Sequence, residues 1–92
     1  MLTTIKTFKD NICTGIWIEN NDHLIYIPFG LALALADSLT FDDKDSNPYD
    51  MIGYIEIFYE YSGDILLNDG SESVRIEKCE VKKFINELWS MV

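Results

Sequence analysis

Alternating apolar and polar positions predict two strands and a turn near the start of the chain. Over residues 12–19, isoleucines recur at even positions, which is the two-residue period of a half-buried strand. Residues 20–22 are Asn, Asn and Asp, which tolerate the left-handed backbone of a tight turn. Residues 23–27 are again rich in strand-forming side chains, so we expect a β-hairpin. Residues 1–10 carry a weaker pattern and predict a short strand or an irregular arm.

Leucine and alanine dominate the next stretch and predict a helix that is apolar on nearly all sides. Pro28 suits the first turn of a helix, where its missing N–H group is not needed. Leu31, Leu35 and Leu39 lie four residues apart, and a helix that is apolar all round is normally buried. The alternation of leucine and alanine also fits a buried strand. Both residue types favour helix, so we predict a helix here.

The middle of the chain predicts a loop followed by three strands. Residues 41–50 are expected to form a loop because Asp, Ser, Asn and Pro cluster there. Residues 52–61 are dense in Ile, Tyr and Phe and predict one strand, with a second at 65–68. An Asp-Gly dipeptide at 69–70 is a strong signal for a two-residue hairpin turn and leads into a further strand at 73–79.

The last predicted element is an amphipathic helix at the C-terminal end. Its apolar residues follow helical spacing of three and four, whereas Lys, Asn and Glu fill the opposite face. The apolar residues are Val81, Phe84, Ile85, Leu88, Trp89 and Val92. Together these elements predict an α+β fold in a single domain, residues 1–92. We expect a small antiparallel β-sheet of about four to five strands with two helices, the C-terminal helix packed on the sheet.

The chain is strongly acidic, with 16 acidic and 7 basic residues and a net charge of −9. Nucleic-acid phosphates and anionic lipids repel such a chain, so we expect it to bind neither nucleic acid nor membranes directly. Complementary charge favours a basic protein partner, although acidity that serves only solubility is the alternative. Residues 19–72 hold 12 acidic residues and one base, a net charge of −11, so the acidity is concentrated in the middle.

The cysteines and the apolar segments bear on the compartment. Cys13 and Cys79 do not make a disulfide framework, and each lies in an apolar stretch where a small buried side chain is expected. Residues 1–10 lack the apolar core of a signal peptide. The most apolar run, 25–36, is shorter than the ~20 residues that span a bilayer, and we predict a cytoplasmic protein.

Motifs for catalysis or metal binding are missing from the sequence. There is no glycine-rich phosphate loop, nucleophile elbow or paired-histidine helix, and the single histidine, His23, is expected at a hairpin end. Residues 43–47 resemble the start of a calcium loop, but Pro48 stands where glycine belongs and Tyr54 where the bidentate glutamate belongs. We therefore predict no enzyme activity, no metal site and no cofactor.

One strand face stands out as a candidate binding surface. Alternation over 52–61 places Tyr54, Glu56, Phe58 and Glu60 on the first face of the predicted strand. It places Ile55, Ile57, Tyr59 and Tyr61 on the second face, which is expected to face the core. The first group mixes two aromatic residues with two carboxylates, as expected where a basic partner docks, unless a helix buries it. With the acidic loop included, the predicted partner-binding residues are Asp42, Asp43, Asp45, Asp50, Tyr54, Glu56, Phe58 and Glu60.

In size, acidity and lack of catalytic motifs, the chain resembles the toxin-neutralising immunity proteins of bacteria, which are antitoxins. The resemblance implies a toxin inhibitor that covers the cationic active-site surface of a basic toxin by a protein–protein interaction. If the toxin is a nuclease, carboxylates take the place of phosphates. One alternative is a phage-type inhibitor of a nucleic-acid-guided nuclease. The other is a homo-oligomeric, small-ligand or calcium-binding domain whose acidity serves solubility.

Overall fold

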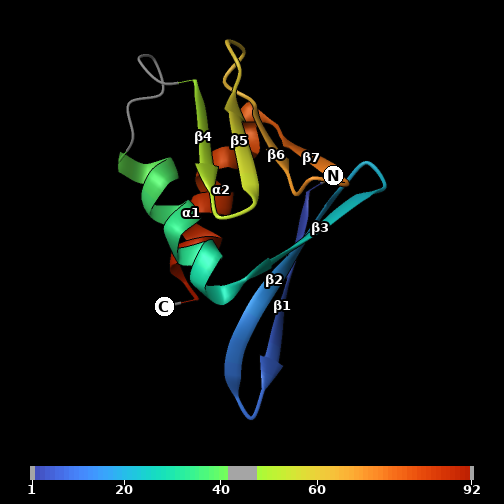
Figure 1. Ribbon diagram of the computed structural model, residues 1–92, viewed down its shortest axis with the longest axis vertical. Coiled ribbons are helices and arrows are strands. Elements are labelled where there is room, and N and C mark those ends of the chain that lie inside the picture. The colour runs from blue at the N-terminus through green and yellow to red at the C-terminus, as the bar shows by residue number, and fades with distance from the viewer. Residues whose placement is uncertain (1, 42–47, 92) are drawn as a thin grey trace.

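The computed structural model describes residues 2–41 and 48–91, which form two antiparallel sheets and two helices (Figure 1). The three-stranded sheet has the order β1 (Thr3–Lys9), β2 (Ile12–Asn20), β3 (His23–Pro28), and α1 (Phe29–Phe41) follows it. The four-stranded sheet has the order β4 (Tyr49–Ile52), β5 (Ile55–Tyr59), β6 (Ile65–Asn68), β7 (Ser73–Ile76), and α2 (Lys78–Trp89) ends the chain. The α+β class is confirmed, but the strands form two sheets rather than one of four to five strands.

Tight turns with left-handed backbone close both hairpins of the three-stranded sheet. Asp10 and Asn11 join β1 to β2 with φ angles of 53° and 64°. Asn21 and Asp22 join β2 to β3 with φ angles of 52° and 67°. Asn and Asp tolerate this conformation better than other side chains, which is why these positions reverse the chain. The predicted hairpin is confirmed, and the N-terminal arm is a strand because β1 pairs with β2 along its whole length.

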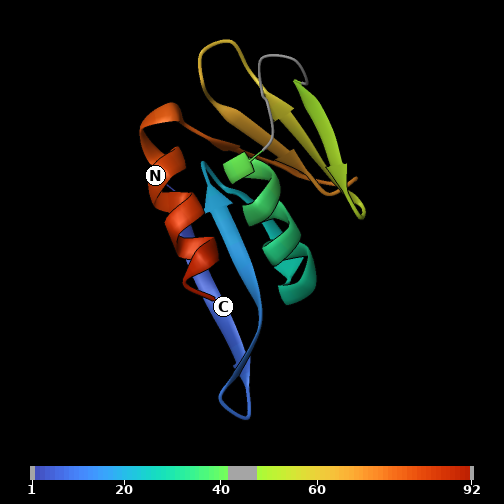
Figure 2. The same ribbon diagram turned by 90° about the vertical axis from the view of Figure 1, so that its left-hand side faces the viewer.

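Both helices lie on one face of the three-stranded sheet, where Figure 2 shows them side by side. The predicted helix after Pro28 is confirmed as α1, whose buried side chains include Leu35 and Leu39. The C-terminal amphipathic helix is confirmed as α2, with Phe84 and Leu88 buried. Trp89 is 38% exposed at the edge of α2, where its Nε1 donates a hydrogen bond to Thr40 Oγ1 of α1 at 2.9 Å.

The single strand predicted over 52–61 is wrong, because a turn divides this segment into β4 and β5. Ile52 pairs with Ile55, so Gly53 and Tyr54 form a two-residue turn. Gly53 has φ of 60°, and a Cβ there would lie 2.7 Å from Leu31 Cδ2, so the turn sits close against α1. A glycine first in a two-residue hairpin turn supplies the positive φ without strain. β4 therefore occupies residues that the sequence had assigned mostly to a loop.

The chain after β6 also departs from prediction in three places. The hairpin loop between β6 and β7 has four residues, 69–72, because Asn68 pairs with Ser73. Strand β7 ends at Ile76 instead of Cys79, and Cys79 is an exposed residue of α2. Cys13 is partly buried against the core. The prediction of a buried Cys79 is thus wrong, because the helix begins earlier than the apolar spacing alone indicates.

One hydrophobic core joins both sheets and both helices. Isoleucine, leucine and valine from the inner faces of the strands supply most of it, and α1 and α2 supply the rest. Its least exposed large side chains are Phe84, Ile16, Ile18, Ile25, Ile27, Leu35, Leu39, Ile55, Ile57, Ile65, Leu67 and Ile76. The prediction that Ile55 and Ile57 face the core is confirmed. Tyr59 is partly buried, whereas Tyr61 lies beyond the end of β5 and is fully exposed.

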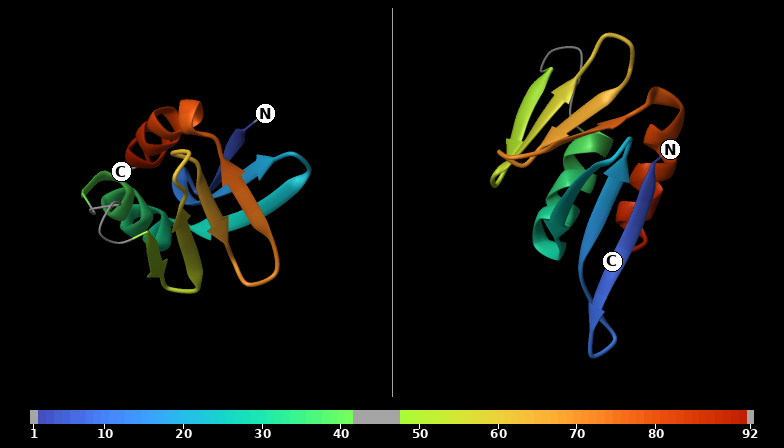
Figure 3. Two further views of the ribbon diagram at one scale, coloured as in Figure 1. Left: turned by 90° about the horizontal axis from the view of Figure 1, so that it is seen from above. Right: turned by 90° about the vertical axis from the view of Figure 1, so that its right-hand side faces the viewer.

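The two sheets meet where β2 and β3 lie beside β7 (Figure 3). The side-chain amide of Asn20, at the end of β2, donates a hydrogen bond to the carbonyl oxygen of Arg75 at 2.6 Å. Next to it, His23 Nδ1 contacts Glu72 Oε1 across the same junction. His23 therefore lies at a hairpin end, as predicted. In the described part of the chain, neither helix has the length and apolar character needed to cross a bilayer.

Candidate functional site

Strand pairing defines the outer face of the four-stranded sheet, which points away from the core. Residues opposite one another in an antiparallel pair share a face, so two rows of four residues run across the strands. The rows are Tyr49, Phe58, Leu66 and Arg75, and Met51, Glu56, Asn68 and Ser73. Tyr49 is 41% and Met51 is 52% exposed. Among the described residues, neither helix covers this face, since both pack on the core side.

An aromatic pair and a carboxylate occupy the β4–β5 end of this face. The rings of Tyr49 and Phe58 lie with centroids 5.1 Å apart and tilted by 53°. The Tyr49 hydroxyl donates a hydrogen bond to Glu56 Oε2 at 2.8 Å. This hydrogen bond raises the pKa of Tyr49 above its ordinary value of 10.0, because the bond requires the protonated hydroxyl. The bond also orients Glu56 beside the two rings.

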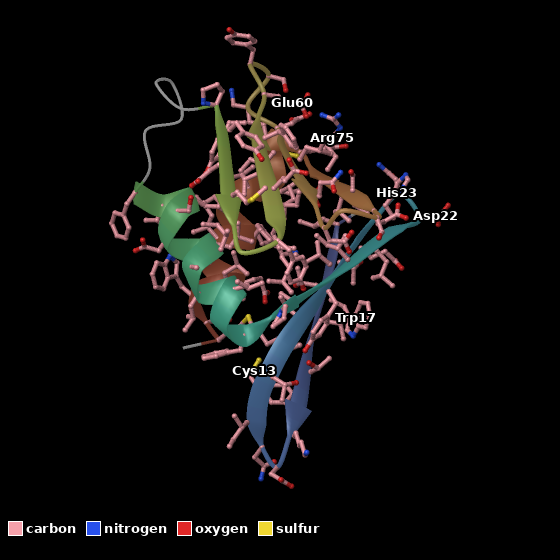
Figure 4. All side chains as sticks on the ribbon, viewed as in Figure 1. Cys13, Trp17, Asp22, His23, Glu60 and Arg75 are labelled. Atoms are coloured by element: carbon pink, nitrogen blue, oxygen red, sulfur yellow. The ribbon has the colours of Figure 1, made fainter. Side chains whose placement is uncertain are left out.

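An ion pair lies at the far end of the same face. Arg75 Nη1 contacts Glu60 Oε1, and Asp64 Oδ2 lies 3.8 Å from the same nitrogen. Figure 4 shows Glu60 and Arg75 next to each other where β5 ends. Because Arg75 already neutralises part of the charge of Glu60, Glu60 attracts a basic partner less strongly than Glu56 does.

The structure brings together three of the eight predicted partner-binding residues. Glu56, Phe58 and Glu60 share the outer face of the four-stranded sheet, and they are partly exposed rather than buried under a helix. Tyr54 belongs instead to the β4–β5 turn, where its hydroxyl lies 3.5 Å from the carbonyl oxygen of Tyr26 on β3. The turn at Gly53 moves Tyr54 off the strand face, so its predicted place there is wrong.

Of the predicted acidic residues before β5, the structure describes Asp50 alone. Asp50 pairs with Ile57 and so lies on the inner side of β4, where its Oδ2 accepts a hydrogen bond from Ser38 Oγ at 2.9 Å. Asp50 was predicted as part of the acidic loop, and because alternate residues of β4 point to opposite faces, it lies across the sheet from Glu56 and Phe58. The remaining predicted residues, Asp42, Asp43 and Asp45, lie outside the described residues.

Sequence reasoning missed Tyr49 and Met51, which complete the exposed apolar part of the face. The signal was present as a short alternation at 49–52 directly before Gly53. Aspartate and proline just upstream made the whole stretch resemble a loop. Recognising Gly53 as the first residue of a two-residue turn would have revealed β4.

Charge is distributed unequally over the molecule. Residues 48–77, which contain the four-stranded sheet, hold seven acidic residues and one basic residue, for a net charge of −6. Of the basic residues in the described part of the chain, five lie on β1 and α2: Lys6, Lys9, Lys78, Lys82 and Lys83. The outer face of the four-stranded sheet therefore belongs to the acidic part of the described chain, and it carries Tyr49, Met51, Phe58 and Leu66 beside Glu56.

No group of three or more His, Cys, Asp or Glu side chains is placed to hold a metal ion in residues 2–41 and 48–91. Comparison with protein-family models, with curated proteins and with solved structures found no match to this chain. The geometry of the outer face and the charge around it are therefore the observations that bear on function.

Proposed function

We propose that this protein binds a basic protein partner through the outer face of the four-stranded sheet and blocks it. The proposed role is that of a cytoplasmic immunity protein or antitoxin of bacteria, which covers the cationic active-site surface of a toxin such as a nuclease. The single observation that supports this role most is the pair of exposed Tyr49 and partly exposed Phe58 with Glu56 beside it, in a segment of net negative charge.

The composition of this face suits a protein interface more than a catalytic site. Aromatic residues and methionine are enriched where proteins bind one another, because they bury large areas at a small entropic cost. Tyr49, Met51 and Phe58 supply such anchors within two neighbouring strands. Exposed apolar groups grouped on one sheet face also mark interaction surfaces in general.

Glu56 gives this interface its chemical preference for a cationic partner. Its carboxylate accepts one hydrogen bond from Tyr49 and has acceptor sites left for another donor. An arginine guanidinium binds a carboxylate through two parallel hydrogen bonds and also stacks on aromatic rings. An arginine or lysine that normally holds a phosphate would therefore pair with Glu56 and lie against the neighbouring ring of Phe58 or Tyr49.

The negative field around the face would speed the encounter with a basic partner. Such steering acts over a screening length of about 8 Å at physiological ionic strength and weakens as salt is added. We expect the association rate to fall with salt while the dissociation rate changes less. An association rate that does not respond to salt would contradict the electrostatic part of the proposal.

The test starts from the basic proteins encoded next to this gene, because a toxin and its immunity protein are expressed together. Each is purified, and binding is measured by surface plasmon resonance together with loss of the partner's activity. Tyr49→Ala is expected to weaken binding by about 2 kcal/mol or more, as hot-spot residues do, and Glu56→Gln to slow association.

Two variants serve as controls for these measurements. Asp37→Asn removes one negative charge from the exposed side of α1 and is expected to leave binding nearly unchanged. Ile57→Ala, in the core behind the same strand, should instead lower stability by about 2–5 kcal/mol. If Glu56→Gln and Asp37→Asn weaken binding equally, net charge rather than the outer face is responsible, and the proposed site is wrong.

A further inference from the structure

The three-stranded sheet has an outer face of its own, on the side away from both helices. Figure 3 shows this sheet in front of the helices, and Figure 4 shows Trp17 pointing away from them. Strand pairing sets three residues of this face in one row, Ile5 opposite Trp17 and Trp17 opposite Tyr26. We refer to this surface as the outer face of the three-stranded sheet.

Large apolar side chains at the centre of this face remain in solvent. Ile5 is 56% exposed, Trp17 39% and, in the next row, Leu24 43%. The rings of Trp17 and Tyr26 lie with centroids 4.9 Å apart. The Tyr26 hydroxyl lies over Gly15, which leaves room for it, and donates a hydrogen bond to the Thr14 carbonyl oxygen at 3.2 Å. Ile5, Trp17 and Tyr26 thus form a row across all three strands.

This face is also nearly free of charge, unlike most of the molecule. In strands β1 to β3, which the structure describes in full, Lys6 packs toward α2, where its Nζ donates a hydrogen bond to Ser90 Oγ at 2.7 Å. The charged residues left near the outer face are Glu19, paired with Thr3 at one end, and Lys9, paired with Ile12 at the other. The two charges are opposite in sign and lie at opposite ends of the β1–β2 pair, Lys9 on β1 and Glu19 on β2.

We propose that the outer face of the three-stranded sheet binds a second copy of this chain. Two molecules of net charge −9 repel each other over most of their surfaces, and this nearly neutral apolar face is where they can meet without opposing carboxylates. Face-to-face packing about a two-fold axis would bury the two apolar rows against each other, as in a β-sandwich.

The two end charges select one of the possible orientations. When β2 of one copy runs opposite to β2 of the other copy, Lys9 of each copy lies toward Glu19 of the other. When they run in the same direction, Lys9 faces Lys9 and Glu19 faces Glu19, which costs energy. The dimer therefore has antiparallel strands across its interface, with Trp17 near the axis.

The size of the face sets the expected strength of this dimer. A standard interface buries about 800 Å² per partner, roughly one seventh of the 5560 Å² surface of this protein. Strand β2, with nine residues, is about 30 Å long, and three strands at about 4.8 Å spacing give a narrow face. A face of about 30 by 14 Å covers roughly 400 Å², which is below the standard size, so we expect a weak dimer with a dissociation constant in the upper micromolar range.

Sedimentation equilibrium from about 1 μM to about 1 mM tests the proposal, because that range brackets a micromolar dissociation constant. The mass is expected to rise from that of one chain, 10.6 kDa, toward that of two. Ile5→Lys places a charge at the β1 end of the apolar row, next to Trp17, and should raise the dissociation constant at least tenfold. Met51→Lys is the matched control, since Met51 is 52% exposed on the other sheet and the charge change is the same.

Fluorescence provides a second readout at the proposed interface itself. In the Trp89→Phe variant, Trp17 is the one remaining tryptophan of the chain, and its emission should shift to shorter wavelength as the dimer forms. A mass of one chain at every concentration, or an Ile5→Lys protein that dimerises as well as wild type, would overturn the proposal. If Met51→Lys loses partner binding but still dimerises, the two outer faces act separately, and the dimer does not depend on the proposed function.

Discussion

The two sheets of this protein are alike on their inner faces and different on their outer faces. Both inner faces are built from isoleucine, leucine and valine, for example Ile18 in one and Ile57 in the other, each fully buried. The segments that form the two sheets also differ in charge, since residues 1–28 carry two basic and three acidic residues, a net charge of −1, against −6 for residues 48–77. The shared core determines the fold, whereas the outer faces can vary without disturbing it. We therefore look for function on the outer faces.

The difference also separates two kinds of recognition. The outer face of the three-stranded sheet offers an apolar row with little charge, which favours its own copy. The outer face of the four-stranded sheet offers aromatic anchors beside a carboxylate in a negative field, which favours a basic protein. A dimer through the first face would leave the second face of each copy open, so two partners could bind at once.

The largest effect is expected from Phe84→Ala, which tests whether the two sheets depend on one core. Phe84 is 1% exposed on α2 and belongs to the cluster that includes both inner faces. Its removal leaves a large cavity and should lower the free energy of unfolding by about 3–5 kcal/mol, measured by urea denaturation. Both sheets should lose protection together, which hydrogen exchange at the amides of Ile18 and Ile57 will show.

The exposed neighbour provides the control for this experiment. Lys83→Ala should change stability by no more than about 0.5 kcal/mol, as surface substitutions usually do. If Phe84→Ala destabilises only one sheet, or if two unfolding transitions appear, the sheets are independent units and the comparison above no longer rests on a shared core.

A smaller loss is expected from Gly15→Ala, which disturbs the outer face of the three-stranded sheet alone. A Cβ at this position would lie 2.3 Å from the Tyr26 hydroxyl and 2.7 Å from the carbonyl oxygen of Ile27. The tyrosine ring can move aside, but the backbone oxygen cannot move without distorting β3. We expect a loss of about 1–3 kcal/mol in thermal or urea unfolding.

Gly30→Ala is the matched control, because nothing lies within 4 Å of a Cβ built there on α1. In a helix this substitution should be neutral or stabilise by up to about 1 kcal/mol. Equal effects at Gly15 and Gly30 would mean that Tyr26 does not lie over Gly15 as described.

Asn20→Ala tests the junction between the sheets. Asn20 is 3% exposed, and its amide donates to the Arg75 carbonyl oxygen at 2.6 Å. Removing the Asn20 amide leaves the Arg75 carbonyl oxygen with one hydrogen-bond donor fewer, which should lower the free energy of unfolding by about 1–3 kcal/mol. His23→Ala breaks the neighbouring contact with Glu72. The side chains of His23 and Glu72 are 58% and 41% exposed, so the free energy of unfolding should fall by only about 0–1 kcal/mol. Equal losses would show that the buried amide does not hold the junction.

Much of the fold could be predicted, because local signals agree with tertiary packing in those places. The Asn21–Asp22 turn has the backbone that its residues favour, and α2 buries the stripe that its spacing indicates. The β4–β5 hairpin could not be predicted as easily, because Gly53 lies inside a run of strand-forming residues and reads as part of one strand. Only the positive φ at Gly53 and its contact with Leu31 show that the chain reverses there.

The candidate site was predicted only in part, because some of its residues follow a local pattern and others depend on pairing between strands. Alternation within β5 is local, so Glu56 and Phe58 were placed correctly on one face opposite Ile57. Their neighbour Tyr49 comes from another strand, and pairing across strands depends on where the turn falls. The apolar row of the three-stranded sheet was missed likewise, since it requires the register that the turn at 10–11 imposes between β1 and β2.

The smallest effect concerns the titration of Tyr49 on the outer face of the four-stranded sheet. Its hydroxyl donates to Glu56, and the charges of Glu56 and Asp50 add to this bond in raising the pKa above 10.0. A raised pKa means that the folded protein holds this proton more tightly than the unfolded chain. The stabilisation is therefore complete below the ordinary tyrosine pKa of about 10 and is lost as the pH rises through the higher value of the folded state.

NMR titration of the tyrosine ring carbons, with Tyr49→Phe to assign the signal, should show Tyr49 ionising above its ordinary value. In Glu56→Ala the value should fall back toward 10.0, because the acceptor and its charge are gone. If Tyr49 titrates at its ordinary value in both proteins, Glu56 is not oriented by this bond, and the electrostatic contrast between the two outer faces rests on net charge alone.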